Sequence, residues 1–139
     1  MDIKGENKAK KENYVENDYA EIWIEDGIVM QVFKPHIKKI TLEMGKQMVK
    51  DRLIAMSGVS RPLFVDTMNA IDMDKEVRDY FVSPESIQYI NASAFLIHNY
   101  LTFLGAKLFV GFTKSPVKTE FFKTRSQALK WLEPFKNIN

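Results

Sequence analysis

The sequence predicts an α/β fold in which packed helices cover a mostly parallel sheet that begins with an antiparallel hairpin. Asp26-Gly27 stands between two apolar runs that alternate with polar residues, and an Asp-Gly pair supplies the positive φ angles of a two-residue turn. The run PLFVD is short and apolar without alternation, as expected of a strand covered on both faces. After the hairpin, a helical segment separates each strand from the next, and such connections form right-handed parallel crossovers.

The expected elements follow the order ββαβαβαβα, and only the first strand pair is expected to be antiparallel. Strands are predicted near residues 20–26, 28–34, 62–66, 90–97 and 117–122, the last as an edge strand. Helices are predicted at about 41–56, 74–81 and 99–111, before a final helix that Thr124 or Ser126 caps. Gly45 inside the first helix costs roughly 1 kcal/mol relative to alanine. A close approach of this helix to the sheet would explain the presence of a glycine here, and chance is the alternative.

The composition is that of a soluble single domain, with 45% apolar and 27% charged residues in a chain of 139. Twenty basic and eighteen acidic residues give a net charge of +2, too weak and too dispersed to favour nucleic acid. The absence of cysteine excludes disulfides and thiolate zinc sites and predicts a cytoplasmic protein. Polar residues interrupt the longest apolar stretch, residues 92–112, so no stable membrane insertion is expected.

The first seventeen residues differ from the rest of the chain. Residues 1–17 are polar and nearly free of large apolar side chains, and they contain no apolar core of a signal peptide. We therefore expect residues 1–17 to form a flexible charged arm and residues 18–139 to form a single α/β domain.

Five stretches carry a resemblance to a known family: YAEIWIEDGIV, ITLEMGKQMVKDRL, RPLFVDT, KEVRDYF and KTEFFKTRSQALKWL. Over residues 19–135 the chain resembles the small bacterial STAS-like domains, which are related to the sporulation anti-sigma-factor antagonists and are often labelled STAS/SEC14-like. It looks closest to an uncharacterised branch common in Bacteroidetes. The resemblance implies a STAS-like fold and a protein-interaction or ligand-sensing module rather than an enzyme.

The resemblance also directs attention to Thr67. In the antagonists, a serine just beyond the third strand is phosphorylated to control partner binding. This chain has Thr67 in that neighbourhood, followed by Met68 and Asn69, and it lacks the antagonists' serine motif. Thr67 is therefore a phosphorylation candidate that departs from the family's pattern.

Polar side chains also gather where two strands of the expected sheet end, the edge at which parallel sheets bind ligands. The candidate ligand-binding residues at this edge are Asp66, Thr67, Asn69, His98 and Asn99. The alternative interpretation is loop organisation, in which Asp66 satisfies loop amides, Thr67 makes a local turn and Asn99 caps the next helix. We favour loop organisation.

No catalytic, metal or cofactor motif is recognisable in the sequence. His36 and His98 stand far apart, and the aspartates before the second helix are expected to stabilise its positive end. The chain lacks a G-x-S-x-G elbow, a phosphate loop and a G-x-G-x-x-G motif. Neither a cofactor nor a metal is expected. Two classes of function remain: a regulatory module that binds a partner protein, and a carrier or sensor of a small apolar or lipid-like ligand.

The third predicted helix favours self-association. At about 100° per residue, the side chains expected to pack on the sheet are Tyr100, Leu101, Leu104, Leu108, Phe109 and Phe112. The expected interface on the opposite side consists of Phe103, Ala106, Lys107 and Val110, with Lys107 at its polar rim. We predict a homodimer that meets at this interface. Cover by the N-terminal arm and contact with an apolar ligand are the alternatives.

Overall fold

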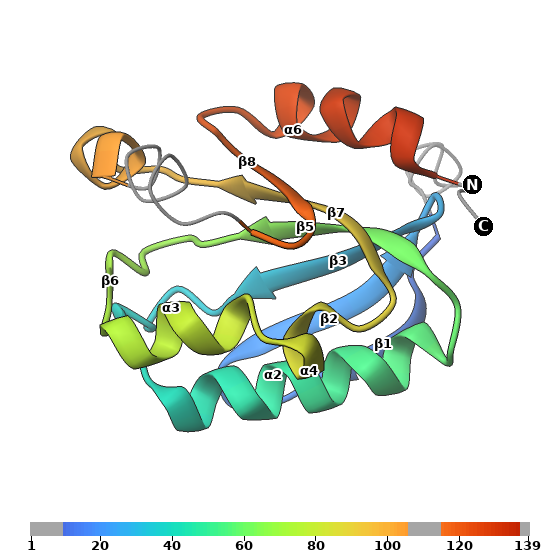
Figure 1. Ribbon diagram of the computed structural model, residues 1–139, viewed down its shortest axis with the longest axis horizontal. Helices are drawn as coiled ribbons and strands as arrows, with labels where there is room; N and C mark the ends of the chain where they lie inside the picture. The colour runs from blue at the N-terminus through green and yellow to red at the C-terminus, as the bar shows by residue number, and fades with distance from the viewer. Residues whose placement is uncertain (1–9, 106–114, 137–139) are drawn as a thin grey trace, which may run out of the picture.

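The computed structural model describes residues 10–105 and 115–136 and shows a six-stranded sheet with helices on both faces (Figure 1). The strands are β1 (Glu12–Glu16), β2 (Ala20–Glu25), β3 (Ile28–Phe33), β5 (Arg61–Asp66), β7 (Ile90–Leu96) and β8 (Lys118–Phe122), and they lie side by side in this order. A separate two-stranded sheet pairs β4 (Lys39–Ile40) with β6 (Asp72–Met73).

Helices of unequal length cover the two faces of the sheet. They are α2 (Leu42–Met56), α3 (Lys75–Phe81), α4 (Pro84–Ile87) and α6 (Arg125–Leu132), with a 3₁₀ turn η1 (Glu133–Phe135) after α6 and a helical stretch at residues 100–105. In Figure 1, α2, α3 and α4 lie on one side of the sheet and α6 lies on the other. Thr41 caps α2 by accepting from the amide of Met44, and Thr124 caps α6 by accepting from the amide of Gln127, as their sequence positions predict.

The predicted hairpin and parallel sheet are confirmed. β2 and β3 are antiparallel, with Glu25 opposite Ile28, and the turn residues Asp26 and Gly27 have φ angles of 52° and 80°. Two positive φ angles are what a two-residue hairpin turn requires. β3, β5, β7 and β8 pair in parallel in that order, and β8 is an edge strand.

The prediction of a flexible arm through residue 17 is wrong for residues 12–16, and so is the prediction of a single antiparallel pair. These residues form β1, which pairs antiparallel with β2 and places Val15 opposite Ile22. Val15 packs against the core, and the ring of Tyr14 stacks on Trp23 at 6.3 Å between centroids. These few apolar contacts form only where β2 offers an edge for pairing. The polar composition of residues 12–16 alone therefore does not predict them.

Asn17 fastens β1 and the following turn to the rest of the domain. Its Nδ2 donates to Asp51 Oδ2 of α2 at 2.7 Å, and its Oδ1 accepts from the amides of Tyr19 and Ala20 at 2.8 and 2.9 Å. Asp51 is buried, so loss of this donor would leave a carboxylate oxygen with fewer partners inside the fold.

We therefore expect Asn17→Ala to lower the free energy of unfolding by about 2–3 kcal/mol, at roughly 1 kcal/mol for each lost hydrogen bond. Asp18→Ala is the matched control, because Asp18 is exposed and should change stability by less than about 0.5 kcal/mol. Urea denaturation of the three proteins checks this. Equal stabilities for the two variants would contradict the anchoring role of Asn17.

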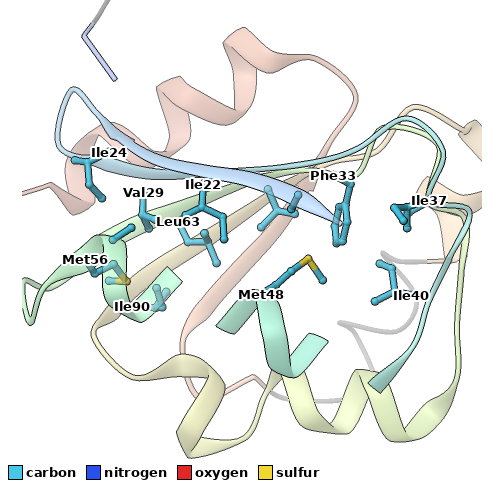
Figure 2. Close-up of a cluster of buried hydrophobic side chains, with 14 of the residues drawn as sticks. Ile22, Ile24, Val29, Phe33, Ile37, Ile40, Met48, Met56, Leu63 and Ile90 are labelled. Atoms are coloured by element: carbon cyan, nitrogen blue, oxygen red, sulfur yellow. The ribbon is translucent and has the colours of Figure 1, made fainter. Parts of the chain in front are cut away.

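The core is divided between the two faces of the sheet because successive strand residues point to opposite sides. Leu63 and Val65 of β5 belong to the cluster on the α2 side, whereas Phe64 between them belongs to the cluster under α6. Figure 2 shows the α2-side cluster, in which the strand side chains lie opposite Met48 and Met56 of α2.

Gly45 permits a close approach, but the partner is a helix and not the sheet. A Cβ atom at this position would lie 3.2 Å from Cζ of Phe81 in α3, which is tighter than ordinary van der Waals contact. The missing side chain thus allows α3 to pack close to α2. This contact holds Phe81 at the wall of the cavity described below.

Candidate functional site

The structure places Asp66, Thr67 and His98 at the sheet edge that the sequence singles out. Asp66 is the last residue of β5, Thr67 follows it, and His98 lies just beyond β7. His98 Nε2 lies 2.8 Å from Asp66 Oδ1, and the same carboxylate oxygen accepts from the amide of Met68 at 2.9 Å. Asp66 and His98 therefore form one polar pair at this edge.

The two asparagines of the predicted set serve separate loops. Asn69 Nδ2 donates to the carbonyl of Pro35 at 2.8 Å, on the side of β3. Asn99 Oδ1 accepts from the amide of Thr102 at 3.0 Å and so caps the helical stretch at residues 100–105. Both side chains make the contacts of loop organisation, and only Asp66 and His98 contact each other.

Thr67 is tied to the neighbouring strand. It is 6% exposed, its hydroxyl donates to the carbonyl of Leu96 at 2.7 Å, and its amide donates to the same oxygen at 3.1 Å. The local turn expected for its hydroxyl is replaced by this link between β5 and β7. A kinase would have to break the link before it could reach the oxygen.

We therefore expect Thr67 to carry no phosphate. Protein purified from its own cells should give the unmodified mass for the peptide that contains Thr67, and a peptide phosphorylated elsewhere in the same digest would serve as the positive control. Stoichiometric phosphothreonine at this position would overturn the expectation.

The predicted dimer interface is covered only in part by the described residues, because Ala106, Lys107 and Val110 lie outside them. Phe103 is half-buried, and Lys123 Nζ lies 5.6 Å from its ring centroid. Leu101, expected to pack on the sheet, is 77% exposed, and Tyr100 and Leu104 are also exposed. The expected orientation of this helix is therefore wrong for residues 100–104, and a homodimer stays a prediction.

A cavity that the sequence interpretation missed lies on the α2 face of the sheet. Its volume is about 550 Å³. Strands β3, β5, β7 and β8 form its floor, and α3 and the segment around α4 contribute to its walls. Most of the lining side chains are apolar, among them Leu63, Val65, Phe95 and Phe121.

The strand register arranges the floor of the cavity in two rows. Gln31, Val65, Phe95 and Phe121 pair in succession across β3, β5, β7 and β8. In the next row, Leu63 pairs with Ser93, which pairs with Thr119. Polar groups are thus set at defined places within an apolar floor.

Arg52 of α2 supplies a buried cation to the wall of this cavity. It is 2% exposed, its Nη1 donates to Gln31 Oε1 at 3.4 Å, and its Nη2 donates to the carbonyl of Ser86 in α4. Its Nε has no hydrogen-bond partner in the described structure. Burial lowers the pKa of Arg52 to about 10, below the ordinary value of an arginine, because the charged form loses its hydration.

Two polar residues at inward positions could have revealed this site. Arg52 lies four residues from both Met48 and Met56, within the buried stripe of α2. Gln31 lies between Val29 and Phe33 on the buried face of β3. Polar residues at core positions of two elements that pack together are a signal of a buried polar cluster.

The described residues offer neither a metal cluster nor a membrane-spanning helix. In the described ranges, no three His, Asp or Glu side chains come together in a way that suits a metal ion. No helix within residues 10–105 and 115–136 has the length and apolar character needed to cross a bilayer.

The order of the strands and helices assigns the chain to a known fold class, and comparison with a solved structure supports this assignment. The structure is similar to that of an uncharacterised DUF3478-family protein with a SpoIIAA-like fold from Shewanella loihica PV-4, with a TM-score of 0.58, 17% identity, and coverage of 85% of this chain and 98% of that chain. The predicted STAS-like fold is thereby confirmed. At this identity the similarity shows the fold alone.

The family follows from the sequence itself. Residues 22–136 match DUF7793, a domain of unknown function, and the chain belongs to this family. No curated protein matches the chain.

Proposed function

We propose that the chain is a non-enzymatic binding module whose ligand is a small, largely apolar molecule held in the cavity on the α2 face of the sheet. One observation carries this proposal: a cavity of about 550 Å³, walled mainly by apolar side chains, with polar groups placed among them. Cavities of roughly 300–1,000 Å³ with this kind of lining are typical of small-molecule sites. The sheet edge at Asp66 and Thr67 ranks below it, because its side chains are engaged in loop contacts.

The other class of function is a cytoplasmic regulatory module that acts through a partner protein or as a homodimer. It is supported by the resemblance to STAS-like domains. A retained small molecule in the native mass spectrum of protein purified from its own cells would favour the ligand-binding module, and a clean apo mass would favour the regulatory module.

The cavity can be tested with the neutral fluorescent probe N-phenyl-1-naphthylamine, whose emission rises in an apolar environment. Ser93 lies in the floor, between Leu63 and Thr119, so Ser93→Phe should place an aromatic ring inside the cavity and Ser93→Ala should leave it open. We expect the unmodified protein and Ser93→Ala to bind the probe. Ser93→Phe should bind at least about tenfold more weakly, since the ring would occupy part of the volume that the probe needs.

Circular dichroism and thermal unfolding of both variants establish that the fold is intact. An unmodified, folded protein that leaves the probe emission unchanged would contradict the proposal. So would a folded Ser93→Phe variant that binds the probe as tightly as Ser93→Ala does.

A further inference from the structure

Arg52 carries a buried charge without a counter-ion. In the described part of the chain its acceptors are Gln31 Oε1 and the carbonyl of Ser86, both neutral, and no carboxylate lies within ion-pair distance. Arginine is almost never fully buried unless it is paired, because an ion loses its hydration on leaving water. Neutral acceptors replace only part of that hydration.

Asp72 and Arg78 are the other ionisable side chains that the structure describes in the cavity wall. Asp72 of β6 lines the cavity but is exposed and forms no ion pair with Arg52. The second arginine of the wall, Arg78 of α3, donates to the carbonyl of Met73 at 3.0 Å. Among the described lining residues Arg52 is thus the one buried ionisable side chain, and its positive charge favours an anionic ligand over a neutral or cationic one.

The register gives the charge a defined place relative to the apolar floor. Gln31, the hydrogen-bond partner of Arg52, begins the row that continues through Val65, Phe95 and Phe121. An elongated ligand that pairs with Arg52 over β3 would lay its apolar part across β5, β7 and β8.

We infer that the cavity takes an amphiphile with an apolar body and a single anionic head, a carboxylate or a phosphate, and that Arg52 is the counter-ion of that head. This inference rests on the proposed function, since it assigns the ligand class of the same cavity. Arginine suits both head groups because its planar guanidinium donates to their oxygens. Burial strengthens the pairing because little water screens it.

The first experiment uses the unmodified protein and needs no variant to fold. Decanoate, decyl phosphate and decanol share a ten-carbon chain and differ in the head group, so competition with N-phenyl-1-naphthylamine isolates the contribution of the charge. We expect at least one anion to displace the probe at a concentration about 10- to 100-fold lower than decanol does, the gain typical of a charge-assisted hydrogen bond. The better of the two anions identifies the head group.

Three variants then assign the effect to Arg52. Arg52→Met should abolish the preference for the anion over decanol, measured as the ratio of the two displacing concentrations within the same protein, whereas Arg52→Lys should retain part of the preference because the charge remains. Lys50→Met is the matched control, because Lys50 is an exposed cation of the same helix and its removal changes the net charge equally. High salt should weaken the preference only slightly, since buried pairs are poorly screened.

The outcomes separate the two claims. Equal displacement by decanol and both anions would overturn the anionic head while leaving the apolar cavity in place. A full preference for the anion in folded Arg52→Met would overturn the role of Arg52. Absence of probe and ligand binding to the unmodified protein would contradict the proposed function, and the present inference with it.

Discussion

Replacement of Phe64 by alanine is expected to lower the free energy of unfolding by about 3–5 kcal/mol, the usual cost of removing a buried aromatic ring. Phe64 lies in central strand β5, is 0% exposed, and belongs to the cluster that α6 covers. The guanidinium of Arg125 in α6 lies 5.4 Å from the centroid of its ring. The substitution therefore weakens the packing of α6 on the sheet as well as the packing at the centre of the sheet.

Guanidinium chloride denaturation measures the effect, with Ile54→Ala as control because Ile54 of α2 is 61% exposed. Ile54→Ala should change the stability by less than about 0.5 kcal/mol. Phe64 faces away from the cavity, so the folded fraction of Phe64→Ala should still bind the neutral probe. A loss below about 1 kcal/mol would show that α6 does not depend on this contact.

The second large effect is a dependence of stability on alkaline pH that Arg52 introduces. Burial lowers its pKa to about 10, below the ordinary value of an arginine, so above pH 10 the unfolded state holds a proton that the folded state has released. Stability rises with pH wherever the unfolded state binds more protons. Below pH 10 the buried charge costs the fold on the order of 3 kcal/mol at about 1.4 kcal/mol per pKa unit, and this cost decreases as pH rises above 10.

The test compares the unmodified protein with Arg52→Met at a series of pH values, because the constant packing difference between the two cancels. The unmodified protein should gain stability relative to Arg52→Met as pH rises above 10. A flat difference would contradict the buried charge.

Tyr80→Phe is a control with the opposite sign. Burial and the hydrogen bond that its hydroxyl donates to Glu85 raise the pKa of Tyr80 from 10 to about 12. Its contribution is therefore complete below pH 10 and is lost as pH rises through 12. The unmodified protein should lose stability relative to Tyr80→Phe over that interval.

Local patterns predicted most of the sheet because their physical causes are local. Asp26-Gly27 specifies a turn through its own φ preferences, and an apolar run such as PLFVD specifies a buried strand through its own composition. The position of Asp66 and Thr67 followed from the same reasoning, since parallel strands end at one edge.

The remaining features depend on partners far along the chain. The hydroxyl of Thr67 bonds to Leu96, a contact that requires β5 and β7 to be neighbours. The role of the Arg52 charge depends on its hydrogen bond to Gln31 and on the cavity above the sheet. Several separate segments of the chain form that cavity together. Helical periodicity likewise led to the wrong orientation for residues 100–104, because it separates two faces of a helix without showing which one packs.

The short strand β1 also covers the edge of β2 and so prevents this edge from pairing with strands of other chains. Four of the six residues of β2 are apolar and buried, and without β1 its backbone groups would form an open, unpaired edge of the kind that nucleates aggregation. β1 is a poor template for pairing in turn, because its register shifts between Glu12 and Val15, Asn13 has a φ of 53°, and both of its end residues are exposed glutamates. A fragment that begins at residue 18, the boundary that composition suggests, would therefore be expected to aggregate during expression.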